Sequence, residues 1–203
     1  HASESYLSGG DKLLEKMARF LPKNIKITVI CPKIGIKHWQ QAKHNNINII
    51  SLKPTIFDNK QNPTLIFIAY LTRIWHSYFQ LRKIKDLDII YSSTNVFPDV
   101  VPAFLYTLSH QKPWISRVHH LIQPPFKRPG SLTVNIVSYT TQILANIMLR
   151  NKSTKIFALN TSLENVLGKK GFPPKKIEVL GGGIELEKIQ KEKPFKNIKF
   201  DAV

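Results

Sequence analysis

The stretch from residue 86 to residue 120, DLDIIYSSTNVFPDVVPAFLYTLSHQKPWISRVHH, decides the fold. It predicts a strand over Asp88–Ser92, a helix over Asp99–Ser109 and a second strand over Pro113–His119. A short apolar strand, a helix of at least about ten residues and another strand are typical of a βαβ unit. Because two strands joined in this way run parallel, the stretch predicts a parallel sheet covered by helices.

The same alternation continues on both sides of this unit. Further strands are expected at Ile25–Cys31, Ile47–Leu52, Lys155–Leu159 and Lys176–Leu180. Further helices are expected over Lys12–Leu21, Pro63–Lys85, Ser131–Arg150 with Ser131 as its cap, and Ser162–Lys170, ended by Gly171. The predicted fold class is therefore α/β, a Rossmann-like parallel sheet with helices on both faces.

The chain is strongly basic, with 30 Lys and Arg against 13 Asp and Glu and a formal net charge of +17. Such an excess favours an anionic partner, namely an acidic membrane surface or a phosphorylated substrate. A Lys-rich composition spread over solvated faces is the alternative. Because no DNA- or RNA-binding motif is present and Lys outnumbers Arg, we expect no nucleic-acid partner.

Composition also bears on the compartment and on metals. The single cysteine, Cys31, excludes an internal disulfide and is typical of a reducing compartment. The longest apolar run, Leu65–Leu71, is far shorter than the roughly 20 residues of a membrane span, so no span is expected. The histidines lack the spacing of a zinc site. We therefore expect a cytoplasmic protein or one bound peripherally at the cytoplasmic face of a membrane.

Polar residues and glycines follow the predicted strands. They are Cys31, Ser92–Asn95, His119–His120, Asn160–Thr161 and Gly181–Gly183. Ligands of parallel sheets bind at the carboxyl ends of the strands. The sequence therefore predicts a functional site at this edge.

Ser8-Gly9-Gly10-Asp11 immediately precedes the first predicted helix. Glycines allow close backbone approach, and a helix start offers unpaired N–H groups to phosphates. The stretch is either such a phosphate site or a plain loop, and Asp11 is either part of the site or a helix cap.

Four motifs in order resemble glycosyltransferase family 4. Leu7–Asp11 resembles its GG-x-E loop, although Lys12 stands where Glu is usual. The second motif is residues 86–120, which are similar to its "P-A … P … T-x-H" block, and the third is Thr154–Ser162. The fourth is KIEVLGGGIEL at Lys176–Leu186, where Gly181-Gly182 replaces the usual Pro-Asn. The chain thus resembles the N-terminal half of a retaining GT-B glycosyltransferase of this family.

This resemblance implies transfer of a sugar from a nucleotide-sugar donor to an acceptor hydroxyl with retention of configuration and without a metal or other cofactor. Residues 1–187 would form the Rossmann-like acceptor-side domain, with its first strand apparently missing. Residues 188–203 would form the hinge and the truncated first strand of the donor-binding domain. Such a half is expected to be inactive alone, and its acceptor would be a glycan or a lipid-linked sugar.

The resemblance also assigns site residues. His119 occupies the position of a histidine near the sugar and the acceptor, which predicts a catalytic role; a structural histidine is the alternative. Gly9, Gly10, Asp11 and His120 are predicted to bind substrate or donor phosphate, although His120 also suits a structural role. Arg117 shares a strand face with His119 and is expected to form an ion pair within the sheet.

The helix Ser131–Arg150 has two interpretations. Its apolar stripes suit a core helix. They also suit a partly exposed apolar face beside Lys127, Arg128 and Arg150 that rests on anionic lipid.

Two other functions are alternatives to the transferase. The first is a non-enzymatic basic α/β module that binds an anionic partner or a membrane surface. The second is a nucleotide-dependent Rossmann enzyme such as a sugar-nucleotide epimerase, which is disfavoured because the sequence lacks both G-x-G-x-x-G and Tyr-x-x-x-Lys.

Overall fold

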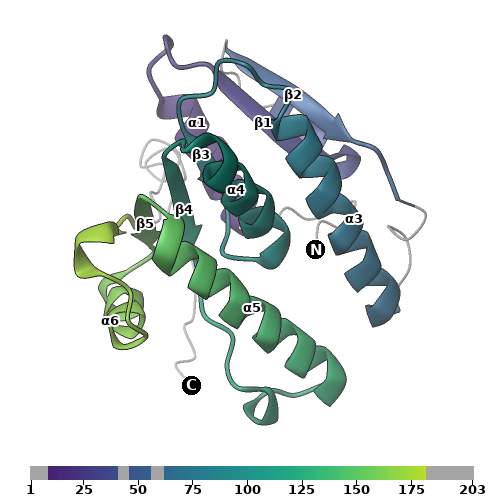
Figure 1. Ribbon diagram of the computed structural model, residues 1–203, viewed down its shortest axis with the longest axis vertical. Coiled ribbons are helices and arrows are strands. Elements are labelled where there is room, and N and C mark those ends of the chain that lie inside the picture. Colours follow the sequence, from purple (N-terminus) through teal and green to yellow (C-terminus); the bar gives the residue numbers. More distant parts are fainter. Residues whose placement is uncertain (1–8, 41–45, 56–61, 182–203) are drawn as a thin grey trace, which may run out of the picture.

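The computed structural model describes residues 9–40, 46–55 and 62–181 (Figure 1). Its strands are β1 (Ile27–Pro32), β2 (Ile47–Leu52), β3 (Ile90–Ser92), β4 (Trp114–Val118), β5 (Lys155–Ala158) and β6 (Ile177–Val179). Its helices are α1 (Gly9–Phe20), α2 (Ile36–Gln40), α3 (Pro63–Leu81), α4 (Phe97–His110), α5 (Leu132–Lys152) and α6 (Thr161–Lys169), with 3₁₀ turns η1 (Lys33–Gly35), η2 (Pro125–Lys127) and η3 (Pro174–Lys176). All predicted strands and helices are present, whereas α2 and the 3₁₀ turns were not predicted.

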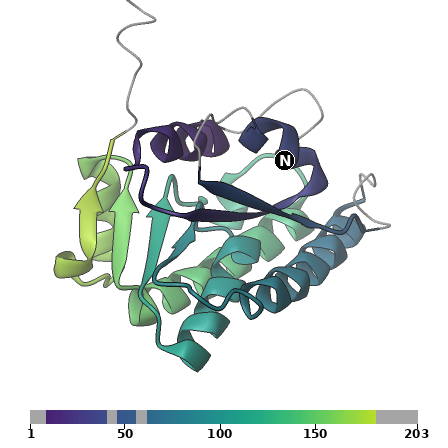
Figure 2. The ribbon, with the colours of Figure 1, turned by 90° about the horizontal axis from the view of Figure 1, so that it is seen from above.

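The strands form two parallel sheets. The larger sheet has the order β3-β4-β5-β6, and its β3–β4 pair begins with Ile90 opposite Trp114. Strands β1 and β2 pair with each other from Ile27–Ile47 to Pro32–Leu52 (Figure 2). Within the described residues neither of these two strands pairs with the larger sheet. The α/β class with parallel strands is therefore confirmed, although the described strands do not form one continuous sheet.

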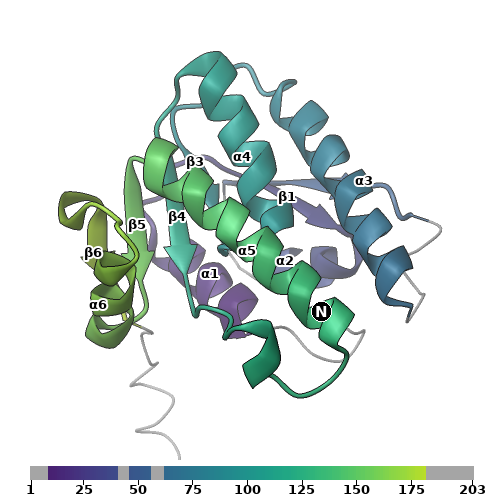
Figure 3. The same ribbon diagram turned by 60° about the horizontal axis from the view of Figure 1, so that its bottom comes forward.

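Helices cover both sides of the larger sheet. Helices α3, α4 and α5 pack side by side on one side, and α1 lies on the other (Figures 2 and 3). Each of the three follows a strand, so α5 returns the chain from the end of β4 to the start of β5. This arrangement places the loops after β3 and β4 at one edge of the sheet.

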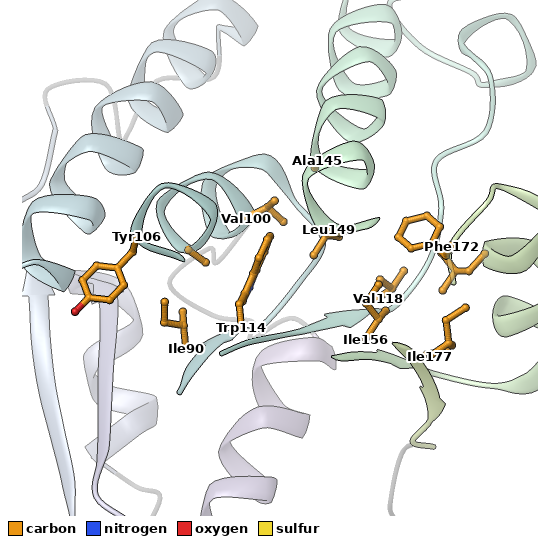
Figure 4. Close-up of a cluster of buried hydrophobic side chains, with 13 residues drawn as sticks. Ile90, Val100, Tyr106, Trp114, Val118, Ala145, Leu149, Ile156, Phe172 and Ile177 are labelled. Atoms are coloured by element: carbon orange, nitrogen blue, oxygen red, sulfur yellow. The ribbon is translucent and has the colours of Figure 1, made fainter. Parts of the chain in front are cut away.

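The core lies between the larger sheet and helices α4, α5 and α6 (Figure 4). Its centre is Trp114, which is fully buried and whose indole Nε1 donates a hydrogen bond of 3.0 Å to Oγ of buried Ser92. The indole contributes a large apolar surface and satisfies its single donor, as buried tryptophans usually do. The other fully buried side chains of this core are Val100, Val118, Ala145, Leu149, Ile156, Ala158 and Leu167.

Two helix starts are capped by asparagine side chains. Oδ1 of Asn62 accepts from the Thr64 N–H at α3, and Oδ1 of Asn160 accepts from the Leu163 N–H at α6. Gly171, just beyond α6, has a φ of +79°, which agrees with the predicted glycine stop. The predicted cap at Ser131 is wrong in its chemistry: Ser131 occupies the N-cap position of α5, but its side chain makes no capping hydrogen bond.

Candidate functional site

A cluster of polar side chains lies at the carboxyl ends of β3 and β4. The hydroxyls of Ser93 and Thr94 donate to Oδ2 of Asp99 at 2.8 and 2.7 Å. Asp99 belongs to the first turn of α4, where the positive end of the helix dipole stabilises a carboxylate. The loop after β3 is therefore fixed to the start of α4.

Both predicted histidines reach this cluster from the end of β4. Nε2 of half-buried His119 lies 3.2 Å from the carbonyl oxygen of Ser93. Nδ2 of buried Asn95 donates to the carbonyl oxygen of His120 at 3.2 Å, and the His120 side chain is exposed. The two strand ends that the sequence identified thus lie together. Sequence reasoning missed Asp99, which it had placed within a helix without assigning it a role.

The histidine ring can exchange protons and hydrogen bonds at this edge. A neutral imidazole that donates from Nε2 to the Ser93 carbonyl presents Nδ1 as an acceptor. An imidazole in this position can accept a hydrogen bond from a substrate hydroxyl or pass on a proton.

Gly9, Gly10 and Asp11 are the first three residues of α1. The predicted loop is thus part of a helix, and Asp11 lies in its first turn rather than at its cap; Leu7 and Ser8 lie outside the described residues. The first N–H groups of a helix have no acceptor within the helix. The structure therefore places these residues at the start of a helix, on a different segment from His119.

Helix α1 lies near the carboxyl end of β4 (Figure 3). Sδ of Met17 is 3.1 Å from Nη1 of Arg117, the next-to-last residue of that strand. Gly10 precedes Met17 by seven residues, so the two residues lie about 10 Å apart along the axis of α1.

Arg117 is 2 % exposed and connects β4 to the chain that leaves β6. Nη2 donates to the carbonyl oxygens of Leu180 at 2.8 Å and Gly181 at 3.4 Å. The predicted ion pair is wrong, because none of the salt bridges among the described residues involves Arg117. Two backbone carbonyls accept from Nη2 instead, whereas the buried Nε has no hydrogen-bond partner among the described residues. Burial raises the pKa of the neighbouring Tyr91, and the positive charge of Arg117 opposes that rise.

Two buried amides fix the loop after β4 to α5. Oε1 of Gln142 accepts from the Ile122 N–H at 2.7 Å, and Nδ2 of Asn135 donates to the Arg128 carbonyl at 3.1 Å. Both amides belonged to the polar remainder of the predicted helix and received no role. Their spacing of seven residues, which places them on one helix face, is the signal that could have found them.

Two other features that can mark a functional site are a cluster of metal ligands and a hollow in the surface. Within residues 9–40, 46–55 and 62–181 no three His, Cys, Asp or Glu side chains gather as metal ligands would. A hollow of about 440 Å³ lined by Gln111, Lys112 and Lys152 lies at the opposite ends of α4 and α5 from Asp99 and His119. It holds none of the polar cluster of Ser93, Asp99 and His119, so we take the carboxyl edge as the candidate site.

The fold matches about half of a GT-B glycosyltransferase. The chain superposes on Anabaena Alr3699/HepE in complex with UDP and glucose with a TM-score of 0.59 at 14 % identity, covering 89 % of this chain and 42 % of that one. Against the same protein in complex with UDP-glucose the TM-score is 0.58 at 13 % identity, covering 92 % and 43 %. Both superpositions therefore cover most of this chain and less than half of the relative.

The sequence identifies the family. Residues 7–188 match the model of Glycosyltransferase Family 4, so the chain belongs to this family. It is also 25 % identical over 179 residues to the glycosyltransferase MJ1069 of Methanocaldococcus jannaschii, covering 87 % of this chain and 44 % of that protein. The chain therefore spans less than half the length of this relative.

Proposed function

We propose that this chain is the acceptor-side half of a retaining glycosyltransferase that uses a nucleotide-sugar donor. The observation that carries the proposal is the polar cluster of His119, Ser93 and Asp99 at the carboxyl edge of a family 4 domain. A structural relative binds UDP-glucose, which supports a donor of this kind. A second domain would hold the nucleotide, in keeping with the 44 % share of MJ1069 that this chain covers.

The reaction breaks the bond between the anomeric carbon and the donor diphosphate. The acceptor hydroxyl oxygen forms the new bond on the same face of the sugar, and its proton passes to a departing phosphate oxygen. Negative charge develops on the diphosphate, and fixed N–H dipoles stabilise such charge effectively. We assign this role to the backbone N–H groups of Gly9 and Gly10 at the start of α1, with Asp11 beside them. We expect no metal or other cofactor to take part.

His119 acts on the sugar or the acceptor. The carbonyl of Ser93 orients its ring, and Asp99 in turn holds the loop that carries this carbonyl. In this position His119 hydrogen-bonds a hydroxyl of the reacting sugar or acceptor, while exposed His120 extends the contact surface for a glycan or lipid-linked acceptor.

The test is the activity of His119→Ala in the full-length protein, assayed for sugar transfer from UDP-sugars. We expect kcat/KM to fall roughly 5- to 150-fold, because a hydrogen bond to a reacting hydroxyl worth about 1–3 kcal/mol is lost, with little change in melting temperature. The control is His110→Ala at the far end of α4, where the ring stacks on Tyr106 and lies apart from the cluster. Equal activity of the two variants would remove His119 from the mechanism. Absence of transfer with every sugar nucleotide in the wild-type protein would favour the non-enzymatic module.

A further inference from the structure

Helix α5 has its polarity reversed relative to an ordinary surface helix. Its buried side includes the amides of Asn135 and Gln142, whereas its exposed side is apolar. The exposed apolar residues are Leu132, Ile136, Val137, Ile143, Leu144 and Ile147. At 100° per residue they cover an arc of roughly 140°, which only threonines interrupt. Such a continuous apolar surface marks a contact site.

The loop before α5 extends this surface and adds positive charge. Phe126 in η2 is 83 % exposed, and exposed Lys127 follows it; the next residue, Arg128, is partly exposed, with one guanidinium nitrogen buried. The Ile122 N–H donates to Gln142, and Asn135 donates to the Arg128 carbonyl, so both amides of α5 hold the loop against the helix. At the other end, Arg150 and Lys152 lie in the last turn of α5. The apolar arc therefore has cations at both ends.

Helix α3, in the same layer, also exposes apolar side chains, although its buried residues Ala69 and Ile74 are apolar as well. Ile68, Leu71, Trp75 and Phe79 follow one stripe at helical spacing, and all four are exposed, Trp75 by 54 %. Neither α3 nor α5 contains an acidic residue, and the single one of α4, Asp99, accepts bonds from Ser93 and Thr94. The exposed sides of α3 and α5 thus carry apolar and aromatic groups and no negative charge, and cations flank α5.

We propose that the exposed apolar arc of α5, with Phe126 and the stripe of α3, is a docking face for an anionic lipid bilayer. The apolar side chains enter the boundary between headgroups and acyl chains, and the cations at the helix ends bind lipid phosphates. The net charge of +17 strengthens the attraction to an acidic leaflet. A second protein copy would instead need acidic groups to meet these cations, and α3 and α5 offer none.

Helix α5 lies on the bilayer rather than across it. By length and composition it is apolar enough to span a membrane, contrary to the expectation from uninterrupted apolar runs, and 17 % of the window concerned is buried. However, Leu149 and Ala145 pack fully buried in the core, and Gln142 and Asn135 bind the loop. Insertion across a bilayer would break these contacts and expose two amides to hydrocarbon, which is unfavourable.

The test is co-flotation of the full-length protein with phosphatidylcholine vesicles that contain or lack phosphatidylglycerol. We expect binding to the acidic vesicles that weakens with salt, and a blue shift of Trp75 fluorescence that Trp75→Phe removes. Ile136→Ser/Ile143→Ser should weaken binding at least about tenfold, because several methylene groups leave the lipid. The matched control is Val166→Ser/Val179→Ser, which changes two similarly exposed apolar residues on α6 and β6.

Three results would overturn the proposal. One is equal binding by the two double variants. Another is vesicle binding whose strength does not change with lipid charge or salt concentration. The third is a wild-type protein that does not bind vesicles but forms a dimer dispersed by Ile136→Ser/Ile143→Ser, which would identify a second copy as the occupant. None of these outcomes depends on sugar transfer, so failure here leaves the proposed function standing.

Discussion

At the residue scale, the buried Arg117 organises a polar interior between β4 and the chain after β6. A guanidinium with 2 % exposure normally needs a carboxylate, yet here it bonds to the carbonyls of Leu180 and Gly181. Arg117 therefore ties the end of β6 to β4, two residues before His119.

Tyr91, next to Arg117, supplies a prediction on pH. Burial raises its pKa above the ordinary value of 10.0. At a pH between the two pKa values, the phenol is therefore protonated in the folded state and ionised in the unfolded state. Stability from this group is complete below pH 10.0 and is lost as the pH rises through the folded pKa. In urea unfolding between about pH 9 and 11, the wild type should lose stability more steeply than Tyr91→Phe, by up to about 1.4 kcal/mol per pH unit.

Tyr139→Phe on α5 controls for removal of a hydroxyl at another position in these titrations. If the wild type and Tyr91→Phe give parallel stability curves at alkaline pH, while Tyr139→Phe also matches them, the phenol of Tyr91 does not titrate differently in the folded protein.

At the element scale, the loop after β4 connects the candidate site to the docking face. It begins at His119, carries Phe126 at η2 and enters α5 at Leu132. Gln142 and Asn135 fix its path from within the helix. A lipid-linked acceptor held at the docking face would thus lie along the loop that leads to His119, which joins the two proposals geometrically.

Removing one of these anchors should loosen the loop. Gln142→Leu keeps the side-chain volume similar but leaves the Ile122 N–H without its acceptor, so we expect a loss of about 1–3 kcal/mol in the free energy of unfolding. Hydrogen exchange at Ile122 should also become faster. Thr140→Leu on the exposed side of α5 is the control and should change stability by about 0.5 kcal/mol or less. Unchanged stability and unchanged protection of Ile122 in Gln142→Leu would contradict the anchor.

The elements differ in how far the sequence could predict them. Strand Ile47–Leu52 was predicted with its observed bounds, because an apolar run closed by Lys-Pro is a strong local signal. The pairing of β1 with β2 apart from the larger sheet could not be predicted, since pairing depends on tertiary packing rather than on local pattern. For the same reason, alternation placed Arg117 on a strand face but could not identify carbonyls as its partners. In α5 the apolar stripes were visible, whereas which face is buried depends on the loop that Gln142 binds.

At the scale of the whole molecule, the protein presents two surfaces with different chemistry. One surface is the carboxyl edge of the larger sheet, where His119, Ser93, Thr94 and Asp99 lie together. Helix α1, a separate segment, contacts β4 through Met17 and Arg117. The layer of α3, α4 and α5 presents apolar and basic groups. The chain covers 42 % of the structural relative, and under the proposed function a second domain would face its carboxyl edge.

Hydrogen–deuterium exchange of the full-length protein, with and without a saturating UDP-sugar and acceptor, tests the central claim most directly. We expect protection at residues 9–12, 93–99 and 119–122, where the proposed phosphate and acceptor contacts lie, and no change at residues 110–113 and 152–154 around the hollow at the opposite edge. Protection confined to that opposite edge, with exchange unchanged at residues 93–99 and 119–122, would contradict the assignment of the site.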